Sequence, residues 1–423
     1  MAKSQSEEKG RYMMKRILMV GAGSCQKSAI LRIKSLGYEV VAADYNEWTE
    51  AKDLADYQVL ADAFSPENIL RCASDFQVQG VMTSGTDQPV LPVTLTANHL
   101  GLPAFLKNET ALRVTNKKKM KERFRETGIP TARFCILGKG FQDRDLQGML
   151  PPYVLKPLDS QGQRGIFKVS AVEGVREKMD EVLRHSRSTE ILVEEFYEND
   201  EITVSGWVDQ GQVYLLTMTD RVTFSPEEHI GVCTSHENPT KHAGAYGTQL
   251  KDLTEKICRE FDIEEGPIYF QYLLGKEGIK VNEIACRLGG AYEDLTTPYA
   301  TGADVLKMNI EGCLSKHYDK KALAVVPAAE KTKPFSTRLF FCGAGKISWM
   351  TPIETVKGLP YVLDAGYNIC VGQILPPIEN ASQRAGYVIL TGETRMEIQE
   401  HLKELRRVLK VLDEEGNNLL RTL

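Results

Sequence analysis

The stretch GPIYFQYLLGKEGIKVNEIACRLGG, residues 266–290, is typical of two β-strands joined by a tight turn. The letters KEG at 276–278 suit a three-residue hairpin loop whose glycine takes the left-handed conformation. This loop would pair Gly275 with Ile279 and thereby fix the register of the two strands. The stretch therefore predicts an antiparallel hairpin with a defined set of side chains on each face.

One face of this hairpin would carry polar side chains in line. The register places Gln271 opposite Glu283, and directly opposed residues share a face of the sheet. Because side chains alternate along a strand, Ala285 and Arg287 follow on that face, whereas Asn282 would point to the other. Oxygen ligands near a phosphate are what Mg²⁺ prefers, usually one or two of them from the protein. The stretch predicts a metal and phosphate surface, with an exposed Glu–Arg pair as the alternative.

Composition limits the class of protein. The chain has 423 residues, enough for about two or three domains at ~100–200 residues each. An apolar content of 42% and a charged content of 26% are ordinary for a globular protein with an adequate core. The net charge of −5 argues against nucleic acid or an anionic membrane as the main partner.

The cysteines and the apolar segments indicate the cellular compartment of the protein. Nine cysteines are scattered without a CxxC pair, which favours a reducing compartment over a disulfide framework. Residues 1–13 are polar and read as a disordered leader that lacks the apolar core of a signal peptide. No apolar run approaches the ~20 residues of a membrane span. We therefore expect a cytoplasmic location.

The first hundred residues alternate between strand and helix patterns, beginning with RILMV at 16–20. That alternation predicts a parallel sheet with helices on both faces, a doubly wound domain. Gly21 and Gly23 follow the first strand and Asp44 ends the second, as in a dinucleotide fingerprint, but Gln26 stands at the third glycine position. We expect no NAD binding, and a first turn that contacts another ligand or only packs.

A glycine-rich loop lies within PYVLKPLDSQGQRGIFKVS, residues 152–170. Lys156 sits inside an apolar strand, where its ammonium costs desolvation unless an anion meets it. Gly162 and Gly165 follow, and glycines let backbone N–H groups approach phosphate oxygens closely. The loop is not a Walker A sequence, so a nucleotide loop and an exposed hairpin turn both remain open.

Acidic residues end the apolar strand of ILVEEFYENDEITVSGW, residues 191–207. In a nucleotide hinge, backbone groups around Glu194, Glu195 and Phe196 would bind the adenine edge, and Glu201 would accept the ribose hydroxyls. The alternative is a strand that simply reaches solvent.

A lysine-rich helix is expected over 115–128. Thr115 or Asn116 would cap its start and Gly128 its end. Most of its lysines would form a solvated face.

These motifs, in this order, resemble the ATP-grasp superfamily over roughly residues 15–315. In that superfamily the first lysine stands eleven residues before the glycine of a GxP turn, as Lys117 does before Gly128 in GIP. Lys156 matches the second lysine. The resemblance implies that ATP lies between two α+β subdomains, with both lysines at its α- and β-phosphates.

The metal motif of the superfamily, E-x-N-x-R, appears here as EIACR at 283–287, with Ala285 in place of the usual asparagine. Gln271 stands where many members carry an acid, which resembles the carbamoyl-phosphate synthetase large chain. The resemblance implies Mg²⁺ or Mn²⁺ held by Gln271 and Glu283, and Arg287 at the transferring γ-phosphate and the acyl phosphate.

The last hundred residues have strand patterns separated by glycine turns and end in a helix, which resembles the C-terminal domain of bacterial L-amino-acid ligases. We expect an α/β and α+β protein in three parts. These are a doubly wound domain at 14–115, an ATP-grasp module at 116–315 with a lid at about 150–206, and an α+β domain at 316–423.

The resemblance implies an ATP-dependent ligase that joins a small carboxylate and an amine through an acyl phosphate, with a homodimer as an open option. Arg287, Gly289, Gly290 and Glu293 are candidates for substrate contact, and Glu293 or Asp294 could instead cap the helix that follows. The alternative is an enzyme acting on bicarbonate through carboxyphosphate, and a third reading is a weakened nucleotide-binding protein. The segment HIGVCTSHENPTKH, 229–242, is expected as a loop beside the substrate pocket rather than a zinc site.

Overall fold

The structure is a computed structural model that describes residues 14–49, 51–225, 229–315 and 317–423. The expected leader at 1–13 lies outside the described residues. Within these ranges, no helix is both long and apolar enough to cross a membrane.

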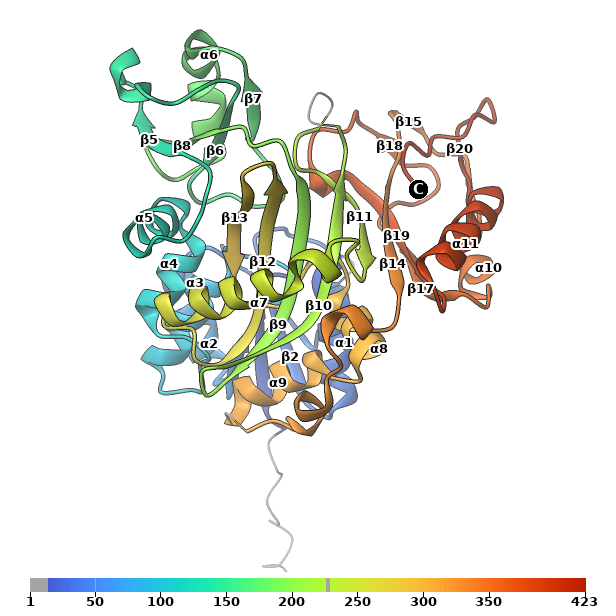
Figure 1. Ribbon diagram of the computed structural model, residues 1–423. Coiled ribbons are helices and arrows are strands. Elements are labelled where there is room, and N and C mark those ends of the chain that lie inside the picture. The colour runs from blue at the N-terminus through green and yellow to red at the C-terminus, as the bar shows by residue number, and fades with distance from the viewer. Residues whose placement is uncertain (1–13, 50, 226–228, 316) are drawn as a thin grey trace, which may run out of the picture.

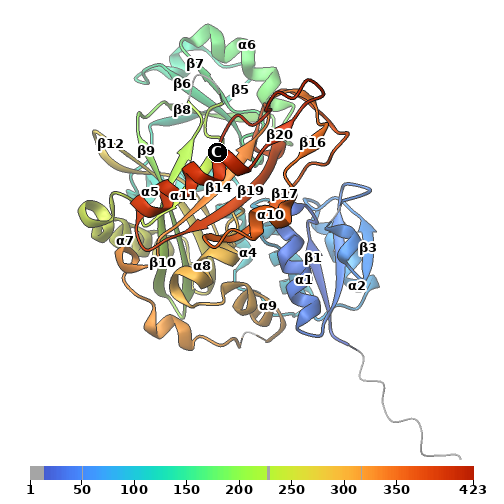
Figure 2. The same cartoon turned by 90° about the vertical axis from the view of Figure 1, so that its right-hand side faces the viewer.

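The N-terminal part is a four-stranded parallel sheet in the order β3-β2-β1-β4. Alternate residues of β1 face opposite sides, because Ile17 packs in one core with α1 and Leu18 in another core with α2. This is the expected doubly wound arrangement, seen edge-on in Figure 2. The elements are β1 Arg16–Val20, α1 Lys27–Ser35, β2 Glu39–Asp44, β3 Tyr57–Leu60, α2 Pro66–Asp75, β4 Gly80–Met82, α3 Val90–His99 and α4 Asn108–Thr115.

The first turn of this sheet is filled by its own side chains. Gln26 accepts a hydrogen bond from the Gly23 backbone N–H at 2.9 Å and donates to the carbonyl of Ser84. Asp44 accepts a hydrogen bond from the backbone N–H of Ala22 at 2.8 Å. The side chain of Gln26, which replaces the third glycine of the dinucleotide fingerprint, therefore fills the loop. Asp44, which would bind a ribose in that fingerprint, instead binds the backbone of the loop.

A second, four-stranded sheet in the order β5-β8-β6-β7 forms the lid. Figure 1 shows it with α6 at the top of the molecule, beyond the tip of the β12–β13 hairpin. Helix α5 leads into it and confirms the predicted helix, because the Asn116 side chain caps its start and Gly128 ends it in the left-handed conformation. The elements are α5 Lys117–Thr127, β5 Phe134–Gly138, β6 Tyr153–Pro157, β7 Phe167–Val169, α6 Val172–Leu183 and β8 Glu190–Glu195.

A third sheet of eight strands, in the order β13-β12-β9-β10-β11-β14-β19-β17, runs through the rest of the molecule. It includes strands from both sides of the expected domain boundary, because β11 pairs with β14. The C-terminal part therefore extends the sheet of the preceding part, and the domain boundaries remain predictions. The strands are β9 Asp200–Asp209, β10 Gln212–Thr223, β11 Cys233–Asn238, β12 Gly266–Gly275, β13 Gly278–Ala285, β14 Phe335–Phe341, β17 Val362–Tyr367 and β19 Arg384–Thr391.

Helices cover this large sheet on its two sides (Figure 2), with α11 lying along the C-terminal strands. They are α7 Ala243–Glu260, α8 Glu293–Thr301, α9 Val305–Ser315, α10 Ile353–Lys357 and α11 Arg395–Val408. Two short strand pairs, β15 Gly345–Lys346 with β18 Ile374–Leu375 and β16 Trp349–Met350 with β20 Val411–Leu412, complete the C-terminal part.

The β12–β13 hairpin confirms one predicted pairing and corrects another. Gln271 lies opposite Glu283 as expected, but Gly275 pairs with Gly278 rather than with Ile279. A β-bulge restores the register, since Gln271 pairs with Glu283 while the next residue, Tyr272, pairs with Val281. Asn282 is the extra residue. A bulge breaks the alternation of side chains, so the predicted direction of Asn282 does not hold.

The segment 229–242 was expected as a loop, and this prediction is wrong for its central part. Residues Cys233–Asn238 form β11, which pairs with both β10 and β14 in the large sheet. All residues of β11 are buried, but most of them are polar, so the sequence lacks the apolar pattern from which a buried strand is predicted.

Candidate active site

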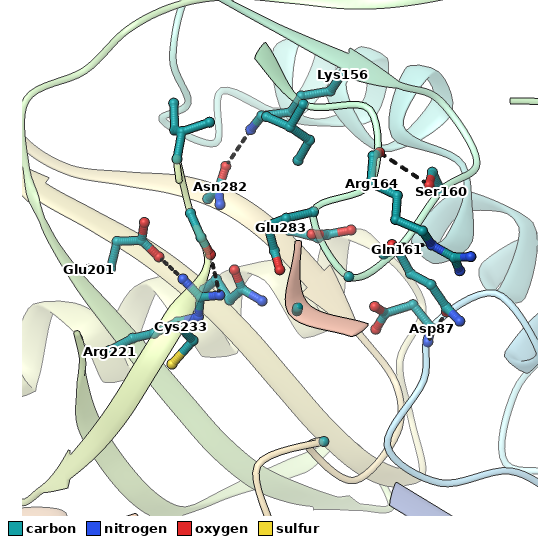
Figure 3. Close-up of a pocket in the computed structure, with 18 of the residues that line it drawn as sticks. Asp87, Lys156, Ser160, Gln161, Arg164, Glu201, Arg221, Cys233, Asn282 and Glu283 are labelled. Atoms are coloured by element: carbon teal, nitrogen blue, oxygen red, sulfur yellow. Dashed lines mark hydrogen bonds and ion pairs between the residues drawn. The ribbon is translucent and has the colours of Figure 1, made fainter. Parts of the chain in front are cut away.

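The predicted site residues gather at a cavity of about 400 Å³ between the lid, the large sheet and the loops of the N-terminal sheet. Figure 3 shows side chains from these parts pointing into one space. Most of the predicted site residues line it, namely Lys117, Lys156, Gly162, Glu194, Glu195, Phe196, Glu201, Gln271, Glu283, Arg287 and Gly290. Gly165, Gly289 and Glu293 do not.

At the lid end of the cavity, one buried acid joins two lysines. Glu194 lies 2.6 Å from Nζ of Lys156 and 2.6 Å from Nζ of Lys121. Burial alone would raise the pKa of Glu194, but the two ammonium groups outweigh it and lower the pKa to about 2. The side chain of Glu194 therefore fixes the ammonium group of Lys156, the lysine predicted to bind phosphate. The sequence predicts only a contact from the Glu194 backbone to the adenine.

The bulged Asn282 faces the same cavity. Lys156 Nζ donates a hydrogen bond to Asn282 Oδ1 at 2.9 Å (Figure 3). The expectation that this side chain faces the other way is therefore wrong, because the bulge sets Asn282 on the same side as Glu283. Lys156 is thus held between the lid strand β8 and the large sheet.

Lys117 and Glu283 form the next pair along the cavity. Their Nζ and Oε1 atoms are 2.9 Å apart, and Lys117 also donates to the Ser160 carbonyl at 3.0 Å. Burial opposes the charge on Glu283, but the nearby Lys117 ammonium lowers its pKa below the ordinary value. The carboxylate therefore stays ionised beside Gln271, its cross-strand neighbour.

An amide oxygen and an ionised carboxylate on adjacent strands fit a hard divalent cation, which takes oxygen ligands. Ala285 is buried directly opposite Tyr269 and offers no oxygen from its side chain. The protein would therefore supply one charged and one neutral ligand, Glu283 and Gln271, and the remainder would come from phosphate oxygens and water.

Arg287 is fixed by a residue of the N-terminal sheet. Its Nη2 lies 2.5 Å and its Nε 2.8 Å from Oδ1 of Asp87, and its guanidinium carbon lies 4.4 Å from the centroid of the Tyr269 ring. Burial disfavours the charge, but Asp87 outweighs it and raises the pKa of Arg287. The guanidinium is thus permanently charged and held at one wall of the cavity.

The glycine loop of the lid closes over this wall. The Gln161 side-chain oxygen accepts hydrogen bonds from the backbone N–H groups of Asp87 and Gln88, at 3.0 and 3.1 Å. Gly162 has a φ of 68°, a conformation that side chains rarely adopt, and no atom lies within 4 Å of where its Cβ would stand. Its backbone is therefore open to a ligand, whereas at Gly165 a Cβ would collide with His185.

The predicted hinge, at the end of the lid strand β8, also lines the cavity. Glu195 accepts a hydrogen bond from the Leu150 N–H at 2.8 Å, and the Phe196 N–H donates to the Pro152 carbonyl at 2.8 Å. Glu201 is paired with Arg221 (Figure 3), whose pKa is raised by that carboxylate against the effect of burial. The carboxylate of Glu201 therefore faces the cavity already neutralised by a guanidinium.

The predicted substrate residues after Arg287 divide between the cavity and its support. Gly290 lines the cavity. Glu293 is buried at the start of α8 and accepts a hydrogen bond from the Ala291 N–H at 2.8 Å, and a Cβ at Gly289 would collide with it. The carboxylate of Glu293 thus braces the loop at the start of the helix, and burial raises its pKa.

The three histidines of 229–242 have separate surroundings. His236 lines the cavity and contacts the Thr219 hydroxyl at 3.0 Å, with its pKa lowered to about 3 by burial. His229 packs on Phe224, and His242 contacts Asp200 at 2.8 Å. In the described part of the chain, no group of three or more His, Cys, Asp or Glu side chains is placed to hold a metal ion.

Sequence reasoning missed several residues of the cavity. Lys121 reads as one more cation on a lysine-rich helix, and nothing in the pattern marks it as buried. Asp87 carries a usable signal, since it follows a strand of a parallel sheet, where ligands gather at the carboxyl ends. The missed residues are Asp87, Lys121, Arg221, Asn282 and Arg384.

Comparisons with known proteins agree with this architecture. Residues 338–412 match the family model of the L-amino acid ligase C-terminal domain 2. The L-amino acid ligase of Bacillus licheniformis superposes with a TM-score of 0.79 at 17% identity, covering 95% of this chain and 99% of that one. The phosphoribosylglycinamide synthetase of Anaerococcus prevotii gives 0.74 at 19% identity, covering 95% and 100%.

Two curated relatives match a shorter part of the chain. A carbamoyl-phosphate synthase of Methanobrevibacter smithii is 29% identical over 41% of this chain and 46% of its own length. A formate-dependent phosphoribosylglycinamide formyltransferase of Prochlorococcus marinus is 25% identical over 45% and 49%. The chain thus spans about half the length of the curated relatives it matches. The ATP-grasp fold and the C-terminal resemblance are confirmed.

Proposed function

We propose that this chain is an ATP-grasp ligase that joins a small carboxylate to an amine, with amino-acid-like molecules as substrates. One observation carries the proposal: Lys117, Lys156 and Arg287 converge on a single cavity with the oxygen pair Gln271 and Glu283. Such a set neutralises a nucleoside triphosphate and the charge that develops as its terminal phosphoryl group moves. The match of the C-terminal residues to an L-amino acid ligase domain supports the substrate class.

The reaction needs no nucleophile from the protein. A substrate carboxylate oxygen attacks the γ-phosphorus of ATP, and the bond from that phosphorus to the β,γ-bridging oxygen breaks. ADP leaves, and the substrate is now an acyl phosphate. The amine then attacks the carbonyl carbon, the carbon–oxygen bond to phosphate breaks, and the nitrogen loses a proton to give an amide and inorganic phosphate. Catalysis is then positioning and charge stabilisation, which suits a cavity of fixed cations.

Each residue group has a place in this scheme. Lys156 and Lys117 would bind the α- and β-phosphates, and the backbone of the Gly162 loop would cover them. Gln271 and Glu283 would hold Mg²⁺ or Mn²⁺, which when bound offsets phosphate charge and orients the phosphates. Arg287, fixed by Asp87, would stabilise the transferring phosphoryl group. The hinge from Glu194 to Phe196 would meet the adenine, and Glu201 the ribose.

The test is phosphate release from ATP with Mg²⁺ across a panel of amino acids and small carboxylates, with mass analysis of the products. Hydroxylamine should trap the acyl phosphate as a hydroxamate when the correct carboxylate is present. ATP binding without phosphate release or hydroxamate for any member of the panel would contradict the proposal.

A second function is favoured by Gln271 and by the similarity to a carbamoyl-phosphate synthase. With bicarbonate as the carboxylate, the same site would form carboxyphosphate. ATP hydrolysis that depends on bicarbonate, with no hydroxamate from any other carboxylate, would decide for this alternative.

Lys156→Ala is expected to weaken ATP binding about 10- to 100-fold, because a charge-assisted contact to phosphate is lost. The measurement is the Kd of ATP with Mg²⁺ by titration calorimetry. Lys139→Ala is the matched control, because this exposed lid lysine pairs with Asp180 outside the cavity and its loss should leave the Kd unchanged. An unchanged Kd in Lys156→Ala would remove the lysine from the nucleotide site.

A further inference from the structure

Arg384, the first residue of β19, brings a guanidinium from the C-terminal part into the cavity. Its Nη1 donates a hydrogen bond to the Gly290 carbonyl at 3.0 Å. Its Nε is buried and has no hydrogen-bond partner among the described residues. A buried donor without a partner is costly, so this side of the guanidinium is suited to a ligand.

Two other arginines of this cavity are already paired with acids, and a third, Arg164 of the glycine loop, donates a hydrogen bond to the Gln161 carbonyl at 3.4 Å. Arg287 is held by Asp87 and Arg221 by Glu201. Arg384 forms no ion pair with a carboxylate of the described residues, and its close neighbours are Tyr292, Cys25 and Cys233. A desolvated cation with neutral neighbours is stabilised when an anion binds beside it.

Tyr292 strengthens the case for a ligand at this point. Its ring stacks on Tyr387 with centroids 3.5 Å apart, and its backbone has a φ of 67°, which is rare outside glycine. Its buried hydroxyl lies beside the Arg384 guanidinium, which acts to lower the pKa of Tyr292 against the effect of burial, and it has no other hydrogen-bond partner in the described part of the chain. A second buried polar group thus lies beside Arg384, and the strained backbone indicates that the ring is held in place.

The position of Arg384 relates it to the reacting end of the cavity. Gly290, which it contacts, is three residues after Arg287. The neighbouring Ala381 N–H donates to the carbonyl of Gly162 in the glycine loop at 3.2 Å. Arg384 therefore lies where the C-terminal part meets both the loop after the proposed phosphoryl-transfer residue and the lid.

We propose that Arg384 binds the free carboxylate of the amine substrate and so selects amino acids over simple amines. This inference rests on the proposed ligase function. A carboxylate matches the planar donor edge that includes Nε, and it would satisfy the buried cation that no acid of the described chain neutralises. The carboxylate that binds Arg384 is distinct from the phosphates of ATP, which would bind Lys117, Lys156 and Arg287.

The test compares Arg384→Met with Arg384→Lys, which keeps the charge but not the planar fork. Arg407→Met is the control, since this exposed arginine lies on α11 in the same part of the chain. L-Amino acids and their carboxamides are compared as ligands by the rise in melting temperature with ADP and Mg²⁺, and as amine substrates by KM. Melting curves without ligand check the folding of each variant.

The unmodified protein and Arg407→Met should favour each bound amino acid over its carboxamide. Arg384→Met should raise the KM for the amino acid about 10- to 100-fold, leave the carboxamide and ATP within about twofold, and abolish the preference. Arg384→Lys should lie between them. A preference that survives in Arg384→Met, an equal loss for acid and carboxamide, or no preference in the unmodified protein would overturn the inference. Failure of the ligase function itself would appear separately, as ATP binding without phosphate release.

Discussion

Glu283→Gln is expected to lower kcat/KM about 10³-fold, the largest effect on activity that the structure predicts. The change keeps the shape of the side chain and removes its charge. Glu283 would be the anionic protein ligand beside Gln271, and it also fixes Lys117 through a contact of 2.9 Å. Loss of this charge would weaken cation binding and leave Lys117 with the Ser160 carbonyl but without its carboxylate partner. The measurement is steady-state turnover at limiting and at saturating Mg²⁺.

Glu277→Gln is the matched control for this experiment. Glu277 lies at the tip of the same hairpin, is exposed, and pairs only with Lys280 among the described residues. Its loss should change kcat/KM by less than about twofold, because an exposed pair contributes little. Glu283→Gln should recover in part when Mg²⁺ is raised. Turnover near that of the unmodified protein at limiting Mg²⁺ would show that the metal binds elsewhere.

The parts of the site that could be predicted from the sequence are those fixed by local pattern. Lys156 in an apolar strand, the glycines after it and the Gln271–Glu283 pairing each follow from a few neighbouring letters, and the structure places their side chains or loops at one cavity. The predicted pairing of Gln271 with Glu283 is correct, although the turn from which it is derived is wrong by one residue. A one-residue error at the turn was cancelled by the bulge at Asn282.

The parts that could not be predicted depend on contacts between distant segments. Asp87 fixes Arg287 across a separation of 200 residues, and Arg384 reaches Gly290 across 94. Strand periodicity also gives no warning that β11 pairs with β14, which joins the C-terminal strands to the large sheet. A bulge is equally hidden, because one extra residue in a strand leaves the local composition unchanged.

Glu194→Gln is expected to lower the free energy of unfolding of the lid by about 3–5 kcal/mol, the largest effect on stability. Glu194 is 3% exposed and contacts two ammonium groups, each at 2.6 Å. Glutamine has nearly the same shape but no charge, so Lys121 and Lys156 would remain buried beside each other without an anion. The measurement is hydrogen exchange of the amides of β6 and β8, together with urea unfolding.

Glu190→Gln provides the control on the same strand. Glu190 pairs with Lys118 at 2.6 Å, but its side chain is 39% exposed, so its loss should cost less than about 1 kcal/mol. Similar losses for the two variants would show that the buried cluster contributes no more than a surface pair.

The pH dependence supplies an independent check on Glu194. Its pKa is about 2 in the folded protein against an ordinary value of 4.5, so the folded state binds the proton more weakly than the unfolded state. The stabilisation from this carboxylate is therefore complete above about pH 4.5 and is lost as the pH falls towards 2. Glu194→Gln has no carboxylate at this position and should not lose this stabilisation in acid. The difference in free energy of unfolding between the unmodified protein and Glu194→Gln should therefore shrink between pH 5 and pH 3, by about 1.4 kcal/mol per pH unit at most. A difference that stays constant over this range would mean that Glu194 is not the charged partner of the two lysines.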